Sequence, residues 1–254
     1  MTFDLGRSIF LQRPVINIIM ESFPATLELT ITAIIITLLI SLPLGILSAV
    51  KQNSPVDYVG MIFAQIGISM PVFWIGLLLI LTFSVNLQIL PSFGRGMALG
   101  RCIAELFATG SAVPLIESLR RLIMPAMSLG IMGAALVSRM IRSTMLEVLE
   151  SDYVRTARAK GTKEFAVIIK HAFRNALLPV VTVVGMQFGT MLGGSIVTET
   201  VFAWPGMGRV VVAAISQRDF PMVQGGVIFF AFVFAMINLM VDMLYMVIDP
   251  KIRQ

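Results

Sequence analysis

The 254-residue sequence is short of charge and of cysteine. Asp, Glu, Lys and Arg make up 13% of it, whereas an ordinary soluble domain carries about 25%. Hydrophobic residues make up 57% of the chain, so the composition predicts an integral membrane protein. The single cysteine, Cys102, excludes a disulfide within the chain, and no Cys/His cluster has metal-ligand spacing. The sequence therefore predicts neither a disulfide nor a metal site.

The sequence also lacks the motifs of common catalytic and nucleotide-binding sites. No GxxxxGK[ST] stretch occurs, so the chain has no phosphate-binding loop, and energy from ATP would have to come from a partner. The absence of HExxH and GxSxG motifs, and of paired aspartates in an apolar run, argues against a membrane-embedded enzyme. We therefore expect no catalytic residues and no cofactor.

Five apolar runs are long enough to cross a membrane. The uncharged run 29–50, for example, reaches roughly 33 Å as a helix, enough to cross the hydrocarbon core. The fold class is thus predicted to be an all-α polytopic membrane protein, with a single transmembrane domain over 25–254 after an external segment 1–24. The five predicted spans are 25–50, 59–90, 122–141, 175–198 and 220–248, and Pro71 is expected to kink the second.

Positive charge gathers between the third and fourth spans. The stretch 139–174, which contains the predicted loop 142–174, holds Arg139, Arg142, Arg155, Arg158, Lys160, Lys163, Lys170 and Arg174. Because Lys and Arg collect on the cytoplasmic side of membrane proteins, we expect this loop and the C-terminus to be cytoplasmic. With five spans and a cytoplasmic C-terminus, the N-terminal residues, including Arg7 and Arg13, would lie outside the cell. No signal peptide precedes them. The simplest explanation is that a further N-terminal span is missing from this chain.

Two short helices are predicted within the cytoplasmic loop. Ser151 is a suitable N-cap, Asp152 falls in the first turn, and Gly161 stands where a helix ends in the left-handed conformation. Thr162 is expected to cap a second helix, whose apolar face is formed by Phe165, Ile168, Ile169, Ala172 and Ala176. Helices this short are marginal alone in water. The residues leave open whether they rest on anionic lipid or on another protein.

At these residues the sequence resembles a known family. The stretches "DYVRTARAKG" and "HAFRNALLPVVT" are similar to the cytoplasmic loop motif of ATP-binding-cassette importer permeases, specifically the dipeptide, oligopeptide, glutathione and nickel group. Ala157 and Gly161 match the motif at the right spacing, and Leu178-Pro179 closes it. Arg155 and Thr156 replace the usual Glu and first Ala, a variant common in the peptide subgroup.

The resemblance extends over nearly the whole chain through "VFAWPGMGR", "RDFPMVQG" and "NLMVDMLYMVIDPKIR". It implies a type I importer permease in the bacterial inner membrane, which forms half of a translocation pathway. The family has six transmembrane helices, and the first has no counterpart here. The implied partners are a second permease subunit, two ATPase subunits and an external solute-binding protein, with no nucleic acid. Di- or oligopeptides are the expected cargo, and nickel or another small solute is the alternative.

The resemblance also implies roles for particular residues. The first loop helix would be a coupling helix seated in a cleft of an ATPase subunit. The residues expected to carry this coupling are Tyr153, Arg155, Thr156, Ala157, Lys160, Gly161 and Pro179.

Weaker candidates for the pathway or its gates are Gln187, Glu199, Asn238 and Asp242. Gln187 and Asn238 are as well explained by hydrogen bonds to neighbouring helices, and Asp242 by an ion pair near a helix end. Glu199 and Arg209 bracket a Trp204-Pro205-Gly206 turn, which is either part of an outer gate or an interfacial anchor through Trp204.

A stand-alone secondary transporter or channel is the rival hypothesis. It predicts several ionisable groups near the middle of the membrane and, in many cases, inverted repeats. Asp242 is the only acid well inside a predicted span, and neither half of the sequence resembles the other. Gly185, Gly189 and Gly193 recur every fourth residue, which favours close helix packing within the chain over a contact with a second subunit.

Overall fold

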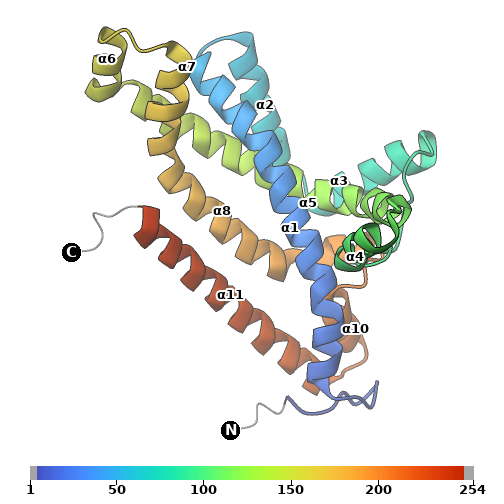
Figure 1. The fold of residues 1–254 in the computed structure, drawn as a ribbon. Helices are drawn as coiled ribbons and strands as arrows, with labels where there is room; N and C mark the ends of the chain where they lie inside the picture. Colours follow the sequence, from blue (N-terminus) through green and yellow to red (C-terminus); the bar gives the residue numbers. More distant parts are fainter. Residues whose placement is uncertain (1–4, 249–254) are drawn as a thin grey trace. The chain divides into compact units, whose positions relative to one another are not determined.

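The computed structural model describes the backbone of residues 5–248, and the side chains of that range except those at 178, 194, 242 and 244–248. The all-α prediction is confirmed for these residues, which form helices and no strand, with one isolated bridge between Arg7 and Pro14. The helices are α1 (Val15–Val50), α2 (Pro55–Ser69), α3 (Val72–Leu79), the π-helix η1 (Ile80–Asn86), α4 (Leu99–Thr109), α5 (Val113–Leu149), α6 (Asp152–Ala159), α7 (Glu164–Ala166), the π-helix η2 (Val167–Phe173), α8 (Arg174–Gly194), α9 (Ile196–Val201), α10 (Met207–Ser216) and α11 (Phe220–Ile248) (Figure 1).

Three stretches of the described chain are long and apolar enough to cross a membrane as single helices: Val15–Val50, Val113–Leu149 and Phe220–Val241. Two bent pairs bring the number to five if each pair is one span, namely Pro55–Ser69 with Val72–Asn86 and Glu164–Leu177 with Pro179–Gly193. Two helices start well before the predicted spans, α1 at Val15 instead of 25 and α5 at Val113 instead of 122. An apolar run marks only the part of a helix suited to hydrocarbon, whereas helices continue beyond it when protein covers them.

The break at Pro71 is larger than the expected kink. α2 ends at Ser69, and Pro71 stands at the N-cap of α3. Met70 has extended backbone angles, φ −86° and ψ 132°, as the steric demand of a following proline favours. The chain therefore ends one helix and begins another here.

The chain divides into two compact units. Unit 1 comprises the residues up to Ala33 with Pro71–Gly130 and Phe188–Met236, and unit 2 comprises Ile34–Met70, Ile131–Gln187 and the residues from Ile237.

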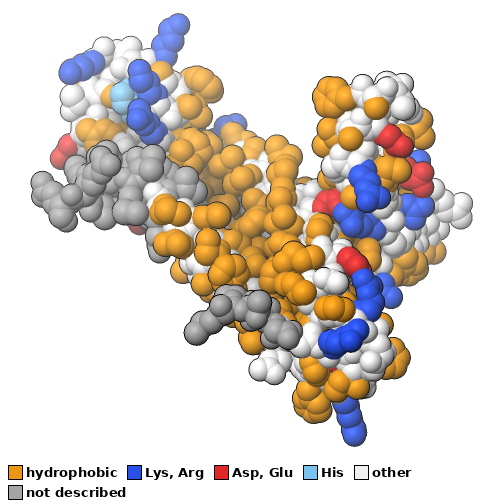
Figure 2. Space-filling view, turned by 60° about the horizontal axis from the view of Figure 1, so that its bottom comes forward, with side chains coloured by type: hydrophobic (Ala, Val, Ile, Leu, Met, Phe, Trp, Pro, Cys, Tyr) orange, Lys and Arg blue, Asp and Glu red, His pale blue; other side chains and the backbone are white. Residues whose placement is uncertain are grey.

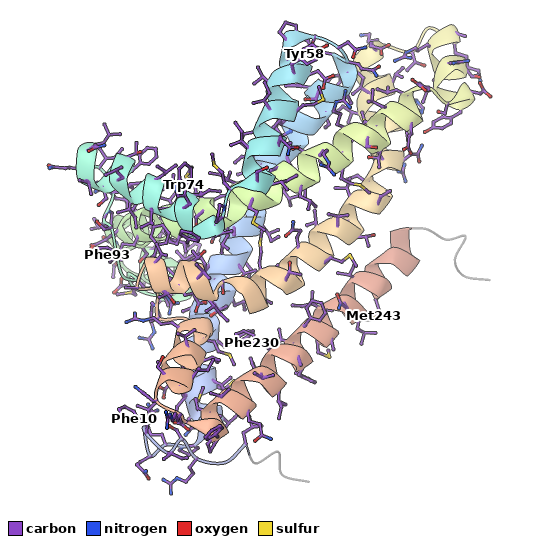
Figure 3. All side chains as sticks on the ribbon, turned by 180° about the vertical axis from the view of Figure 1, so that it is seen from behind. Phe10, Tyr58, Trp74, Phe93, Phe230 and Met243 are labelled. Carbon is purple, nitrogen blue, oxygen red and sulfur yellow. The ribbon has the colours of Figure 1, made fainter. Side chains whose placement is uncertain are left out.

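In unit 1, the first turns of α1 pack against α10 and the start of α11 (Figure 1). Buried side chains of this core include Val15 and Ile19 from α1, Met207 from α10 and Met222 from α11. Phe23 and Phe229 meet edge to face, with ring centroids 5.0 Å apart, and Phe230, labelled in Figure 3, packs against the same core. Aromatic contacts of this geometry stabilise beyond the area they bury.

In unit 2, the core joins the end of α1 to α5, η2 and α8 through Ala49, Val137, Ile141, Met145, Ala172, Ala176 and Val180. Small residues allow these helices to approach closely. A Cβ placed on Gly67 would lie 2.6 Å from Ala135 Cβ, and one on Gly45 would lie 2.7 Å from Ile141 Cβ.

The predicted packing role of the α8 glycines is confirmed at two of three positions. A Cβ on Gly185 would lie 2.3 Å from Val241, within unit 2, and one on Gly189 would lie 2.8 Å from the Phe234 ring, within unit 1. Gly193 meets nothing within 4 Å, so close packing does not explain it.

Candidate functional site

The predicted loop 142–174 begins inside α5, which runs to Leu149, and the rest of it folds into a helical hairpin, residues 151–175, which we call the basic hairpin. Its first arm, α6, begins after Ser151, whose extended backbone (φ −68°, ψ 149°) suits an N-cap, with Asp152 in the first turn. The Ser151 hydroxyl donates to Val148 O at 2.5 Å and makes no side-chain cap bond to α6. The arm therefore starts where predicted, and Asp152 places negative charge at its N-terminus.

Gly161 ends α6 in the left-handed conformation, as predicted, with φ +76°. The Gly161 N–H donates to Arg158 O at 2.9 Å, and the Thr162 N–H donates to Ala157 O at 3.3 Å. This pair of bonds is the Schellman motif, which satisfies the last carbonyls of a helix and reverses the chain. A Cβ on Gly161 would meet nothing within 4 Å, so backbone conformation and not space favours glycine here.

The second arm differs from its prediction. The prediction that Thr162 caps it is wrong, because α7 begins at Glu164 with Lys163 at the N-cap position and no side-chain cap bond. The arm then becomes the π-helix η2 and runs into α8 without a break in helical structure. It is therefore the start of a longer helical segment.

The π-helix also changes which side chains are buried. Its hydrogen bonds join residues five apart, and its buried residues are Val167 and Ala172. Phe165 is 77% exposed and Ile169 is 39% exposed, so the chain itself does not cover the predicted apolar face at those two positions. Ala172 and Ala176, from the same predicted face, are buried within the chain.

Polar contacts tie the two arms together. The Arg158 guanidinium binds the Glu164 carboxylate through two hydrogen bonds, Nε to Oε2 at 3.2 Å and a terminal nitrogen to Oε1 at 2.7 Å. The Tyr153 hydroxyl accepts a bond of 2.8 Å from Asn175 Nδ2 and donates one of 3.4 Å to His171 O. These contacts hold α6 against the start of α8.

The other predicted coupling residues lie on or beside α6. Arg155 is exposed and 3.9 Å from the Asp152 carboxylate, and the Thr156 hydroxyl donates to Asp152 O. Ala157 is half-buried and Lys160 is exposed, whereas Val154 is the one α6 residue that is buried. Figure 2 shows Lys and Arg side chains gathered on the basic hairpin at the upper left.

Pro179 lies apart from the other coupling candidates. It stands inside α8, at the 52° bend between Glu164–Leu177 and Pro179–Gly193. Proline removes a backbone donor and crowds the preceding turn, so it is the local cause of this bend.

An ion pair at the start of α2 was not predicted. Arg142 on α5 binds Asp57 through two bonds, at 2.5 and 2.7 Å, and Asp57 is fully buried. Asp57 also accepts the Asn53 N–H at 3.0 Å. The sequence Ser54-Pro55 marks a helix start, but nothing local pairs residues 57 and 142. The pair fixes the α2 N-terminus to the end of α5 that leads into the basic hairpin.

The predicted gate residue Glu199 lies at the centre of a buried polar cluster in unit 1. Its carboxylate is fully buried and accepts hydrogen bonds from Thr26 Oγ1 at 2.7 Å, Ser195 Oγ at 2.9 Å and the Arg209 N–H at 2.9 Å. A Cβ placed on Gly206 would lie 2.2 Å from the carboxyl carbon. Glu199 thus joins α1, α9 and the N-terminus of α10.

The interpretation of Trp204 as an interfacial anchor is wrong. Its ring is 1% exposed, and its Nε1–H donates to Ala25 O on α1 at 2.8 Å. The turn that contains it is part of the unit 1 core, because the indole and the Glu199 carboxylate both bond to the same part of α1.

The four pathway candidates are not gathered into one cluster. Glu199 belongs to unit 1, whereas Gln187 and Asn238 are half-buried residues of unit 2. The Asp242 side chain lies outside the described residues. The predicted pathway roles of these residues stay predictions.

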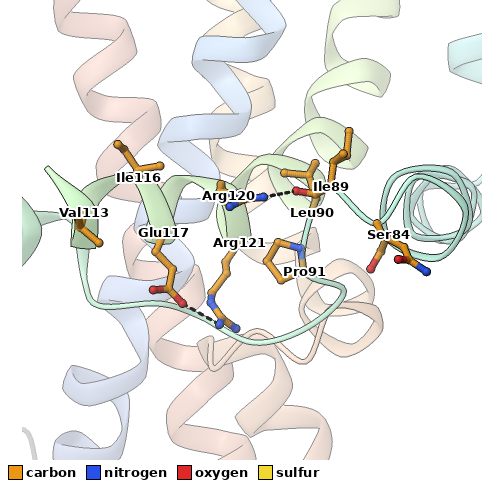
Figure 4. A pocket seen from close by; sticks show the side chains of 10 residues that line it. Ser84, Ile89, Leu90, Pro91, Val113, Ile116, Glu117, Arg120 and Arg121 are labelled. Carbon is orange, nitrogen blue, oxygen red and sulfur yellow. Dashed lines mark hydrogen bonds and ion pairs between the residues drawn. The ribbon is translucent and has the colours of Figure 1, made fainter.

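A hollow of about 520 Å³ lies between the end of η1 and the first turns of α5 (Figure 4). Arg120 on its wall donates to Ile89 O at 2.6 Å, and Arg121 pairs with Glu117 at 3.0 Å. No residue predicted as a site lines it. Its charged groups bond to one another and to the backbone, and so hold the loop against α5.

The fold matches solved ATP-binding-cassette transporters. A chain of the MetNI methionine ABC transporter in inward facing conformations superposes with a TM-score of 0.70 and 17% identity, covering 92% of this chain and 97% of that chain. A chain of an amino acid ABC transporter with histidines gives a TM-score of 0.60 at 17% identity, covering 93% and 94%. The fold is therefore that of a type I importer permease.

The sequence identifies the family more closely. Residues 41–254 match the model of the binding-protein-dependent transport system inner membrane component, and the chain belongs to this family. It is 46% identical to the dipeptide transport system permease protein DppB of Alkalihalophilus pseudofirmus, covering 99% of this chain and 78% of that protein. It is 44% identical to the DppB of Escherichia coli strain K12, covering 98% and 77%. The di/tripeptide permease DppB of Pseudomonas aeruginosa is 42% identical, covering 98% and 76%.

Proposed function

We propose that the chain is one permease subunit of an ATP-driven importer, which carries di- or oligopeptides across the bacterial inner membrane. Similarity to dipeptide and di/tripeptide permeases over almost the whole chain is the observation that supports this cargo. Nickel or another small solute is the alternative cargo. The relatives are permease subunits, which supports a transport role without catalysis by this chain.

The proposed assembly has two permease subunits, two ATPase subunits and an external solute-binding protein. The basic hairpin faces the cytoplasm together with the C-terminus, and α6 seats in an ATPase subunit. The residues of the basic hairpin that would contact the ATPase subunit are Tyr153, Arg155, Thr156, Ala157, Lys160 and Gly161. Pro179 shapes the helix that follows the hairpin.

The basic hairpin is suited to transmit force. It follows α5 after a two-residue turn and continues into α8 without a loop, so both ends attach directly to long helices. The Arg158–Glu164 pair and the Tyr153–Asn175 bond hold its arms together. When the ATPase that binds α6 moves, the movement is thereby transmitted to α5 and α8. Movement of these helices would open the pathway to one side of the membrane and then to the other.

The assembly is tested by copurification and transport. In the complete transporter, Ala157→Arg is expected to abolish copurification of the ATPase subunits, because a large cation replaces a small half-buried group on α6. Ala108→Arg, on the exposed surface of α4, is the matched control and should retain them. Proteoliposomes with the wild-type assembly should accumulate labelled dipeptide only with ATP. Dipeptide uptake by the two permeases without any ATPase would contradict the proposal.

A further inference from the structure

The ion pair between Asp57 and Arg142 links α2 to the helix that leads into the basic hairpin. Both oxygens of the Asp57 carboxylate are used, one by Arg142 Nε at 2.5 Å and the other by a terminal guanidinium nitrogen at 2.7 Å. Asp57 is fully buried, and the Arg142 side chain is mostly buried. A two-bond pair of this kind fixes the angle between its groups as well as their separation. It therefore holds α2 and α5 in one relative orientation.

Asp57 also fixes the turn between α1 and α2. The Asn53 N–H donates to the Asp57 carboxylate at 3.0 Å, and Asn53 has a left-handed backbone, with φ +59°. Ser54 caps the start of α2, because its hydroxyl accepts the Asp57 N–H at 3.5 Å. One residue thus joins this turn, the first turn of α2 and α5. All of these residues lie in unit 2, as does the basic hairpin.

The ion pair borders a gap in the packing between α2 and α5. A hollow of about 240 Å³ lies there, and its walls on these two helices include Gly60, Ala64, Ser138 and Arg142. Gly60 makes its close approach to α1, since a Cβ placed on it would lie 2.3 Å from Ser48 Oγ. α2 packs directly on α5 about two turns further along, where Gly67 meets Ala135. Beside the hollow, the ion pair joins the two helices.

The position of Arg142 on α5 places the ion pair close to the basic hairpin. Arg142 lies about two turns, roughly 10 Å, before the end of α5 at Leu149. The hairpin begins after a two-residue turn, so a movement of the hairpin acts on α5 near this point. Because the ion pair holds the first turn of α2 and Gly67 holds the last, the same movement reaches α2.

We propose that Asp57 and Arg142 are positioning residues that couple ATP hydrolysis to transport, because they transmit movement of the basic hairpin to α2. This rests on the proposed function, in which an ATPase subunit moves the hairpin. With the ion pair intact, α2 and α5 move as one body. Without it, the ATPase still binds and moves the hairpin, but α2 does not follow α5 and the pathway opens incompletely.

The test measures dipeptide uptake and ATP hydrolysis in the same proteoliposomes, which contain the complete transporter and its binding protein. Arg142→Lys keeps the charge and removes the two-bond geometry. It is expected to lower the number of dipeptides imported per ATP by about fivefold, while the ATPase subunits still copurify. Arg139→Lys is the matched control, because Arg139 is exposed on the same helix and borders the same hollow. It should keep the wild-type ratio.

A second set of variants separates coupling from stability. Asp57→Asn and Arg142→Gln each leave one largely buried charge without its partner, whereas the double variant leaves none. Because the two residues act as a unit, the double variant is expected to lower the ratio of dipeptide to ATP no further than either single variant does.

A wild-type ratio in both Arg142→Lys and the double variant would overturn the inference, as would an equal fall in Arg139→Lys. Uptake and ATP hydrolysis that fall together at an unchanged ratio would also overturn it, because the ion pair would then contribute to stability alone. A wild-type transporter that imports no dipeptide with ATP would defeat the proposed function itself, and is thus distinguishable from failure of this coupling role.

Discussion

At the scale of single residues, Gly161 joins the sequence motif to the geometry of the basic hairpin. Its φ of +76° lies in a region that side chains with a Cβ rarely adopt, although the space around it is open. The Schellman bonds to Arg158 and Ala157 require this conformation. The direction in which the second arm leaves α6 therefore depends on one backbone angle.

The destabilisation caused by replacing Gly161 should depend on how well the new residue adopts the left-handed backbone conformation and not on the size of its side chain. Gly161→Val is expected to destabilise the turn by about 1–2 kcal/mol, because a β-branched residue resists the left-handed region. Gly161→Asn should cost less, since asparagine tolerates that region. The measurements are ATPase copurification and dipeptide-stimulated ATP hydrolysis. Equal loss in both variants would show that bulk at this site matters and conformation does not.

Local chemistry was predictable at this scale, and long-range partners were not. Ser151, Asp152 and Gly161 were found because caps and left-handed turns depend on near neighbours. Trp204 was wrongly predicted to be an interfacial anchor because indole side chains in general favour the membrane–water interface. Here the indole N–H instead donates a hydrogen bond to a backbone carbonyl of α1. Asp57 and Arg142 carry no local signal of their pairing, which only the packing of α2 on α5 creates.

At the scale of elements, the π-helix η2 is the feature of the second arm that the sequence did not predict. A period of 3.6 grouped Phe165 and Ile169 with Ala172 on one apolar face. Within η2 the buried residues are Val167 and Ala172, and Ala172 belongs to the core shared with α5 and α8. A π-helix depends on tertiary packing, so the sequence pattern did not indicate it. The end of α6 at Gly161 and an interruption at Pro71 were predictable because glycine and proline act on the backbone directly.

The loop ahead of α1 should open in acid. Burial, the largest single influence, acts to raise the pKa of Asp219, but hydrogen bonds from Ser8, Ile9, Phe10 and Met222 together hold that pKa below its ordinary value. A lowered carboxyl pKa stabilises the folded state above the ordinary pKa, and this contribution is lost as pH falls through the lowered value. The loop should therefore stay closed near neutrality and loosen below about pH 4.

Hydrogen exchange of the Ile9, Phe10 and Leu11 amides, corrected for intrinsic rates, measures this opening between about pH 6 and pH 3. Asp219→Asn should weaken their protection at the higher pH and flatten its dependence on pH. Ser8→Ala is the companion variant, which removes one donor and leaves the carboxylate. Protection that stays constant down to the lowest pH in the wild type would contradict the role given to Asp219.

At the scale of the whole molecule, the family and the fold were predictable because they rest on features spread along the chain. The apolar runs predicted the membrane spans. The loop motif indicated the family, which the match over residues 41–254 confirms. The division into two units was not predicted, because α1, α5, α8 and α11 each run through both units and carry no break in sequence. The central claim is that the basic hairpin is held by an ATPase subunit and not by lipid.

Cross-linking from Phe165 tests that claim most directly. This side chain is 77% exposed on the second arm of the basic hairpin, so a photoreactive residue there reports what covers it without disturbing the core. In intact membranes, position 165 should give an adduct with an ATPase subunit, whereas position 107 on α4, which is 85% exposed, should give none. Adducts of position 165 with phospholipid alone would contradict the account.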